Sequence, residues 1–134
     1  MHSMLYATVG TEDEAVKLAE HLLTKRLVAC ANIIPTRSLY RWKGKIRDER
    51  EFALVMKTRT ELVEGAIKEA KGLHSYHVPC LVSYSMETGL PEYLRWIDVE
   101  TRRPRPKWGF KCELRSCRSP RLPSWGRHRR NSHT

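Results

Sequence analysis

The stretch from Leu27 to Thr58 limits the possible folds most, because it reads as two long strands joined by a tight turn. Its first half is apolar and β-branched over Leu27–Pro35 and continues through Leu39–Trp42. Its second half, Glu51–Thr58, alternates strictly between two sets of side chains, which is the pattern of a strand. Gly44 lies at the centre of the reversal between them. We therefore expect a ribbon that is longer than the rest of the domain can cover.

Two aromatic residues, Tyr40 and Trp42, lie near the tip of this ribbon and would be exposed to water in an isolated chain. They could form a subunit contact or stack on a small ligand, and the enrichment of aromatic residues at subunit contacts favours the first. The charged run from Arg47 to Glu51 is most simply a solvated ribbon edge that discourages aggregation. The ribbon thus predicts a partner chain.

The charge is divided unevenly along the sequence. Residues 1–101 contain 14 Lys and Arg and 14 Asp and Glu, a balance of zero. Residues 102–134 contain 11 basic residues and one acidic residue, Glu113, a balance of +10. The first part has the composition of one folded domain, whereas the second has few aliphatic residues and no periodicity. We expect a domain over 1–101 and a basic, disordered tail over 102–134.

The other patterns predict short elements on both sides of the ribbon. They are a strand at Met4–Val9, a helix capped by Thr11 and ending near Lys25, a helix capped by Thr60 and ending near Gly72, a strand at Val78–Met86, and a short helix from Glu92 to about Glu100. The resulting order, βαββαβ plus a short C-terminal helix, is that of an α+β ferredoxin-like fold.

Such a fold is an antiparallel sheet with two helices on one face, so the opposite face lacks a cover. Alternation along the strands directs Ala29, Ala31, Ile33 and Val55, or the residues next to them, to that face. Trimerisation through sheet faces and ribbon ends would cover it.

Five strings of residues occur in an order and at a spacing that resemble the CutA family of small divalent-cation tolerance proteins. They are LVACANIIP, SLYRWKGKI, KTR, LHSYHVP and YLRWI, and together they span about residues 4–100. The resemblance implies a subunit similar to the PII signalling proteins, a tight homotrimer, and a role in tolerance to copper and other divalent metals. It implies no catalytic reaction, and it does not extend to the tail.

The resemblance also implies a site in clefts between subunits, where a metal or a small ligand would bind. Cys30 and His74 match the cysteine and histidine of that cleft. The other matching cleft positions are Tyr40, Trp42, Lys57 and Tyr76. This chain departs from the family pattern where Ser75, His77 and Cys80 replace a proline and two glutamates, so softer ligands stand in place of carboxylates.

Thiolate and imidazole groups are the ligands that copper prefers, so Cys30, His74 and His77 form a candidate metal site, with Cys80 nearby. Alternatives remain for each residue. Cys30 could be a small buried core residue, His74 could cap helix carbonyls or line a cleft, and His77 could be solvated. On an extended strand His77 and Cys80 point to opposite faces, so a shared site needs a bend at Pro79.

Lys57 could counter an anionic ligand or extend its amine to solvent.

Several classes of function receive little support. The sequence lacks paired carboxylates, a nucleophile elbow and a Gly-rich phosphate loop, so we do not expect an enzyme. The N-terminus lacks the pattern of a signal peptide and no apolar run approaches a membrane span, so we expect a cytosolic protein. Two alternatives to metal binding stay open. One is a PII-like sensor of a small ligand, and the other is nonspecific binding of nucleic acid or another polyanion by the tail.

Overall fold

The computed structural model describes residues 1–102, which form one compact unit, Met1–Arg102. The predicted tail lies outside the described residues, apart from Arg102. The elements are β1 (His2–Val9), α1 (Glu12–Thr24), β2 (Cys30–Trp42), β3 (Lys45–Arg59), a 3-10 turn η1 (Thr60–Leu62), α2 (Val63–Leu73), β4 (Leu81–Ser85) and α3 (Pro91–Glu100).

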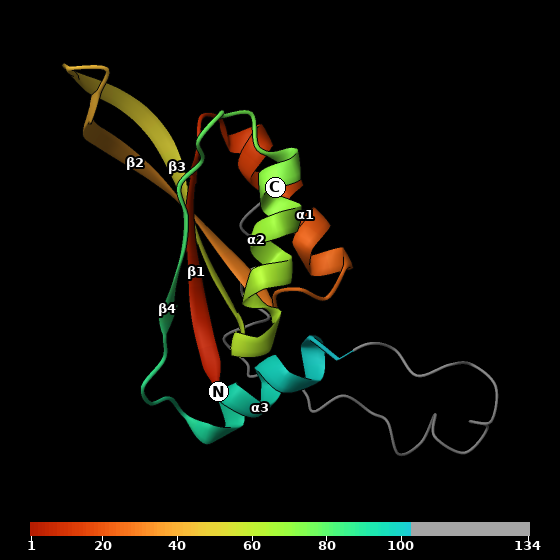
Figure 1. Ribbon diagram of the computed structural model, residues 1–134. Helices are drawn as coiled ribbons and strands as arrows, with labels where there is room; N and C mark the ends of the chain where they lie inside the picture. Colours follow the sequence, from red (N-terminus) through yellow and green to blue (C-terminus); the bar gives the residue numbers. More distant parts are fainter. Residues whose placement is uncertain (103–134) are drawn as a thin grey trace, which may run out of the picture. The chain divides into compact units, whose positions relative to one another are not determined.

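The four strands form one sheet in the order β2-β3-β1-β4, and every pair of neighbours is antiparallel. Helices α1 and α2 lie on one face of this sheet (Figure 1). The predicted α+β ferredoxin-like arrangement is therefore confirmed.

The core lies between the sheet and these two helices. Alternate residues of β1 are buried in this core. Among them, Leu5 pairs with the buried Met56 of β3, and Ala7 pairs with the buried Leu54. The helices contribute stripes of small and branched residues, which are Ala15, Leu18, Ala19 and Leu22 from α1 and Val63, Ala66 and Ala70 from α2. This face of the sheet supplies most of the apolar burial that stabilises the subunit.

The two predicted helix caps had different outcomes. Thr11 caps α1 as expected, because its Oγ1 accepts a hydrogen bond from the backbone N–H of Glu14 at 3.1 Å. The prediction that Thr60 caps the second helix was wrong: Thr60 begins the 3-10 turn η1 and α2 starts at Val63. The Thr60 hydroxyl instead hydrogen-bonds the hydroxyl of Ser3 on β1 at 2.8 Å, a partner that local sequence does not reveal.

Two strand boundaries also differ from the predictions. The first strand of the ribbon starts at Cys30 rather than Leu27, because Leu27 N–H bonds the Leu22 carbonyl and closes α1. The last strand covers Leu81–Ser85 only, since residues 75–78 bend the chain and are followed by Pro79, which has no N–H to donate.

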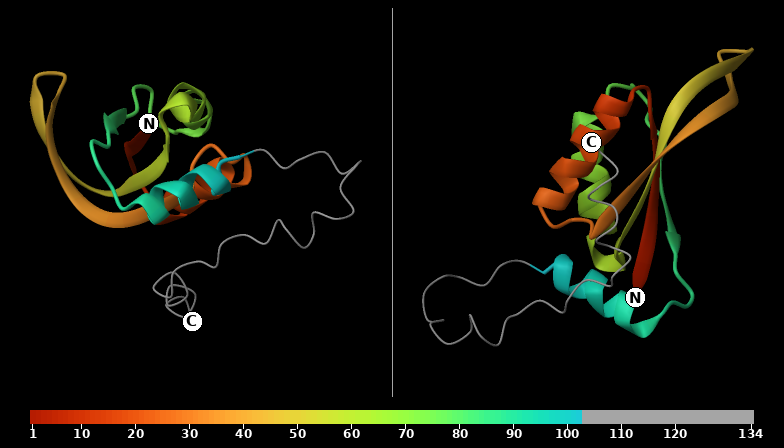
Figure 2. Two further views of the ribbon diagram at one scale, coloured as in Figure 1. Left: turned by 90° about the horizontal axis from the view of Figure 1, so that it is seen from below. Right: turned by 180° about the vertical axis from the view of Figure 1, so that it is seen from behind.

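The face of the sheet away from α1 and α2 is only partly covered. Ala31 and Ile33 pack on the helical side, so the residues next to them, such as Ile34, lie on the open face. Helix α3 contacts one end of that face (Figure 2). There the imidazole of His2 hydrogen-bonds the Asp98 carboxylate at 2.8 Å.

The ribbon formed by β2 and β3 extends well beyond the helices and curls at its tip (Figures 1 and 2). The two strands pair from Cys30 and Lys57 to Trp42 and Lys45. Lys43 and Gly44 make the turn with φ of 51° and 77°, the left-handed pair of a two-residue hairpin. Pro35 is accommodated within β2 because β2 is the edge strand. The curl turns one side of the ribbon back toward the segment that precedes β4.

Candidate functional site: an aromatic and acidic cavity

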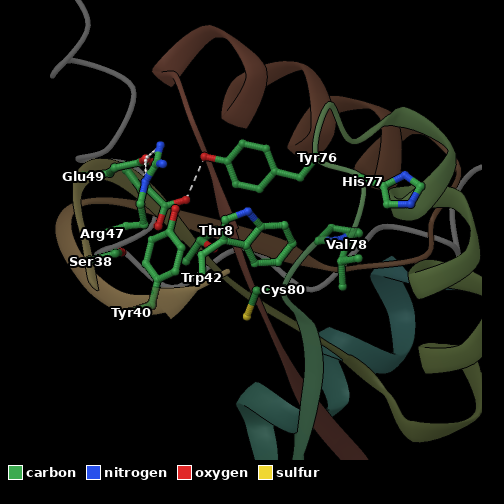
Figure 3. A pocket seen from close by; sticks show the side chains of 12 residues that line it. Thr8, Ser38, Tyr40, Trp42, Arg47, Glu49, Tyr76, His77, Val78 and Cys80 are labelled. Carbon is green, nitrogen blue, oxygen red and sulfur yellow. Dashed lines mark hydrogen bonds and ion pairs between the residues drawn. The ribbon is translucent and has the colours of Figure 1, made fainter. Parts of the chain in front are cut away.

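The ribbon and the segment before β4 enclose a cavity of about 640 Å³ (Figure 3). The ribbon contributes Ser38, Tyr40, Trp42, Arg47, Glu49 and Glu51, and the facing segment contributes Tyr76, His77, Val78, Pro79 and Cys80, with Thr8 of β1 between them. This volume is in the range of small-molecule sites.

A hydrogen bond between Tyr76 and Glu51 joins the two sides of the cavity. The Tyr76 hydroxyl donates to Glu51 Oε2 at 2.8 Å, and Glu51 is only 5 % exposed. Burial, and then the nearby Glu51 carboxylate, raise the pKa of Tyr76 above its ordinary range. Tyr76 therefore keeps its proton and acts as a donor.

The strand register explains why the aromatic and charged residues of the ribbon meet. Tyr40 and Trp42 are two residues apart and share one side of β2, and Arg47, paired with Tyr40, occupies the same side of β3. Arg47 donates to Glu49 Oε1 through Nε at 3.2 Å and Nη2 at 3.0 Å. Burial, followed by the Glu49 carboxylate, raises the pKa of Tyr40.

His74 holds the segment that presents Tyr76. Its Nδ1 accepts a hydrogen bond from the Tyr76 backbone N–H at 3.1 Å, so the proton of the neutral ring lies on Nε2, which donates to the Thr8 carbonyl at 2.7 Å. Glu14 holds the same segment by accepting hydrogen bonds from Ser75 N and Oγ.

Gly10 allows a close approach at this point. A Cβ on residue 10 would lie 3.2 Å from the Tyr76 hydroxyl oxygen, which is tighter than most contacts of a real Cβ. A side chain at residue 10 would therefore require the Tyr76 ring to shift by a few tenths of an ångström.

The predicted metal residues do not come together within one subunit. Cys30 lies at the α3 end of the sheet, where its Sγ is 3.4 Å from the Tyr93 hydroxyl, while His74 binds Thr8 at the other end. Cys30 of β2 pairs with Lys57 of β3, which in turn pairs with Met4 of β1. Met4 lies four residues before Thr8, so the two ends are about 13 Å apart along the strand. Both nitrogens of His74 are engaged in hydrogen bonds. Within residues 1–102, no three His, Cys, Asp or Glu side chains are placed to hold one metal ion.

The other predicted residues divide between the two ends of the sheet. Tyr40, Trp42 and Tyr76 line the cavity together, and His77 and Cys80 lie along the same wall. In Figure 3 the His77 ring points away from the three aromatic residues. Lys57 lies at the opposite end, next to Cys30 in register, and its amine donates to Asn32 Oδ1 at 2.9 Å.

The sequence interpretation missed the acidic residues of the cavity. It took the run from Arg47 to Glu51 as a solvated edge, and for Glu51 this was wrong, because the ribbon curls and buries that side chain. A signal was present in the pattern. Alternation about a turn at Gly44 directs Glu49 and Glu51 to the same side of the ribbon as Tyr40 and Trp42.

Comparison with known proteins decides the family. The model of the CutA1 divalent ion tolerance protein family matches residues 3–100. The chain belongs to the CutA1 family. Divalent-cation tolerance protein CutA from Archaeoglobus fulgidus is 44% identical over 98 residues, which are 73% of this chain and 96% of that protein. CutA from Pyrococcus horikoshii is 35% identical over 100 residues, covering 75% of this chain and 98% of its relative.

Solved CutA structures have the same fold as this CutA1 chain. The structure of the periplasmic divalent cation tolerance protein CutA from Archaeoglobus fulgidus has a TM-score of 0.75 at 42% identity, and it covers 76% of this chain and 100% of its own. CutA1 from Oryza sativa has a TM-score of 0.73 at 32% identity over 77% of this chain and 95% of its own.

Residues 1–102 contain no helix long and apolar enough to cross a membrane.

Proposed function

We propose that this chain forms a homotrimer that binds copper or another divalent metal ion in metal tolerance and homeostasis, and that it catalyses no reaction. The observation that carries the trimer is the large apolar surface that one subunit leaves exposed. The relatives named divalent-cation tolerance proteins support the metal.

The exposed apolar residues lie where a neighbouring subunit would cover them. On the ribbon Leu39 is 64 % exposed and Ile46 is 71 % exposed. On the open face of the sheet Ile34, Val82 and Tyr84 are all more than 40 % exposed. Patches of this kind mark subunit contacts, and a PII-like trimer in which sheet faces and ribbons pack together would bury them.

The separation of the predicted ligands supports a metal site between subunits. Cys30 and His77 lie at opposite ends of one subunit, so they can share a metal ion only if they come from different copies of the chain. A thiolate and an imidazole would suit copper. His74 is less suited than His77, because both of its ring nitrogens already have partners.

Titration of the full chain with Cu(I), Cu(II) and Zn(II) by calorimetry tests this proposal. The double variant Cys30→Ser, His77→Ala should weaken copper binding at least tenfold while the trimer stays intact by light scattering. Cys112→Ser removes a thiol outside the family match and serves as the control. Unchanged affinity in the double variant would remove both residues from the site.

The cavity favours a second candidate function, a PII-like sensor of a small ligand. Its volume and aromatic lining are those of a site for an organic molecule rather than for a bare ion. A panel of nucleotides and metabolites, added in the presence and absence of copper, would separate this function from metal binding.

Two further predictions concern the tail and the location. Nonspecific contact of residues 102–134 with nucleic acid or another polyanion stays a prediction, which deletion of 102–134 would test through the salt-dependent retention of the chain on nucleic acid. The cytosolic location also stays a prediction, and the name of the Archaeoglobus fulgidus structure describes that relative as periplasmic.

A further inference from the structure

Glu51 is an acidic side chain buried in the wall of the cavity, and residues 1–102 supply no basic partner for it. It is 5 % exposed, and among residues 1–102 its single hydrogen-bond donor is the neutral hydroxyl of Tyr76. A buried carboxylate is costly unless a cation or several donors compensate it. The Tyr76 hydroxyl is neutral, so it supplies a hydrogen bond to Glu51 and no compensating charge.

Among the described lining residues, the other two charged groups, Arg47 and Glu49, compensate each other. Arg47 binds Glu49 through two of its nitrogens, both within 3.2 Å of Oε1. One arginine against two glutamates leaves a formal charge of −1 in the described lining, with histidine counted as neutral. The unbalanced charge belongs to Glu51.

Three aromatic rings surround the same space. Tyr40 and Trp42 of the ribbon and Tyr76 of the facing segment lie near one another in Figure 3. The faces of tyrosine and tryptophan rings attract cations, above all alkylated ammonium groups that have little water to lose. A carboxylate beside such rings is suited to an ammonium ion with an organic body.

We propose that this cavity binds a small organic cation, whose ammonium group lies against Glu51 and is surrounded by Tyr40, Trp42 and Tyr76. The size of the cavity, about 640 Å³, leaves room for the organic part of the ligand. An anionic ligand is disfavoured because Arg47 is already engaged.

A bare divalent metal ion fits this cavity less well than an organic cation. The described residues offer no group of three His, Cys, Asp or Glu to surround such an ion. The inference shares only His77 with the proposed metal site, because His77 lines the cavity whereas Cys30 lies at the other end of the sheet. A variant without Cys30 should lose copper and keep the organic cation.

Choline and its neutral carbon isostere, 3,3-dimethyl-1-butanol, are the probes that test the proposal, because they differ in charge and hardly in shape. We expect the full chain to bind choline at least tenfold more tightly than the isostere, as measured by calorimetry. Glu51→Gln should remove most of this preference, since the glutamine carbonyl can still accept from Tyr76 while the charge is lost. Glu64→Gln removes an equal charge from an exposed position on α2 and should change nothing.

Trp42→Leu provides a second test that does not depend on how Glu51→Gln folds. Trp42 is 44 % exposed, so its replacement should leave the subunit folded and weaken choline binding several-fold. Equal affinity for choline and the isostere, or no binding of choline at all, would overturn the proposal. So would Zn(II) that displaces choline from the Cys30→Ser variant at equimolar amounts, because the cavity itself would then be a metal site. A lysine of a second copy that fills the cavity in a solved assembly would also overturn it.

Discussion

The two faces of the sheet are made from the same strands, yet their side chains differ greatly in how far they are exposed to water. On the helical face, Leu54 is fully buried beneath α1 and α2, whereas Ile34 on the open face is 48 % exposed. Ile33 precedes Ile34 and pairs with Leu54 across the strands. A shift of one residue along β2 therefore moves a side chain from the buried face to the exposed one. The helical face stabilises the subunit, and the other face and the ribbon carry the groups that can bind partners and ligands.

The ribbon provides the strongest test of this difference. Replacing residues 39–46 by an Asn-Gly turn removes Leu39, Ile46 and the aromatic tip while the helical face is left intact. We expect the assembly to dissociate into folded single subunits, which light scattering and circular dichroism would detect together. An assembly of unchanged mass would show that the ribbon does not hold it together.

A matched pair of core substitutions separates the two faces. Leu54→Ala should lower the free energy of unfolding by about 3 kcal/mol, because it leaves a cavity in the helical core. Ile34→Ala should lower it by less than about 1 kcal/mol in dilute, dissociated protein, since that side chain stays half exposed. Urea titrations of both variants measure the difference. Equal losses would contradict the assignment of stability to one face.

The hydroxyl of Tyr76 should have a smaller effect on stability. Tyr76→Phe removes the donor to the buried Glu51 and should cost about 1 kcal/mol in the free energy of unfolding. Tyr84→Phe is the control, because Tyr84 is 55 % exposed and its hydroxyl has no hydrogen bond within the described residues. Thermal denaturation of both variants would show whether the loss is specific to the cavity.

The ion pair on the outer side of the ribbon should have the smallest effect, and a dependence on pH. Arg37 binds Asp48 through two hydrogen bonds, 2.8 and 2.6 Å, and holds the pKa of Asp48 below its ordinary value of 3.8. Its contribution is therefore present above pH 3.8 and is lost as the pH falls through the lower folded pKa. Asp48→Asn should lower the Tm slightly at neutral pH and not in strong acid.

Because this pair is exposed, high salt should also weaken its effect. Melting curves of Asp48→Asn and the unsubstituted chain at low and high salt would check this. A difference in Tm that persists in strong acid would show that the side chain acts through something other than its charge.

Local patterns predicted most of the fold and only part of the site. The Thr11 cap and the alternation of Phe52 to Met56 depend on residues near each other in sequence, so they could be read directly. The role of Thr60 could not, because its hydroxyl is bound by Ser3 from a different strand. The burial of Glu51 depends on the curl of the ribbon and on Tyr76, which is 25 residues away in the sequence.

The predicted site residues illustrate the same limit. Tyr40, Trp42 and Tyr76 line one cavity within the subunit, and their place in a cleft between subunits, which the resemblance implies, stays a prediction. The resemblance, together with residue type, suggested that Cys30 and His74 belong to one site, and the register of β1, β2 and β3 separates them in one subunit. Their role as ligands therefore depends on how copies of the chain assemble.

The mass of the full chain in dilute solution, measured by light scattering, tests the central claim that the open face and ribbon are covered by other copies. We predict a particle of three chains of 15.7 kDa, about 47 kDa, that persists at micromolar concentration. A stable, folded particle of 15.7 kDa under the same conditions would contradict the claim.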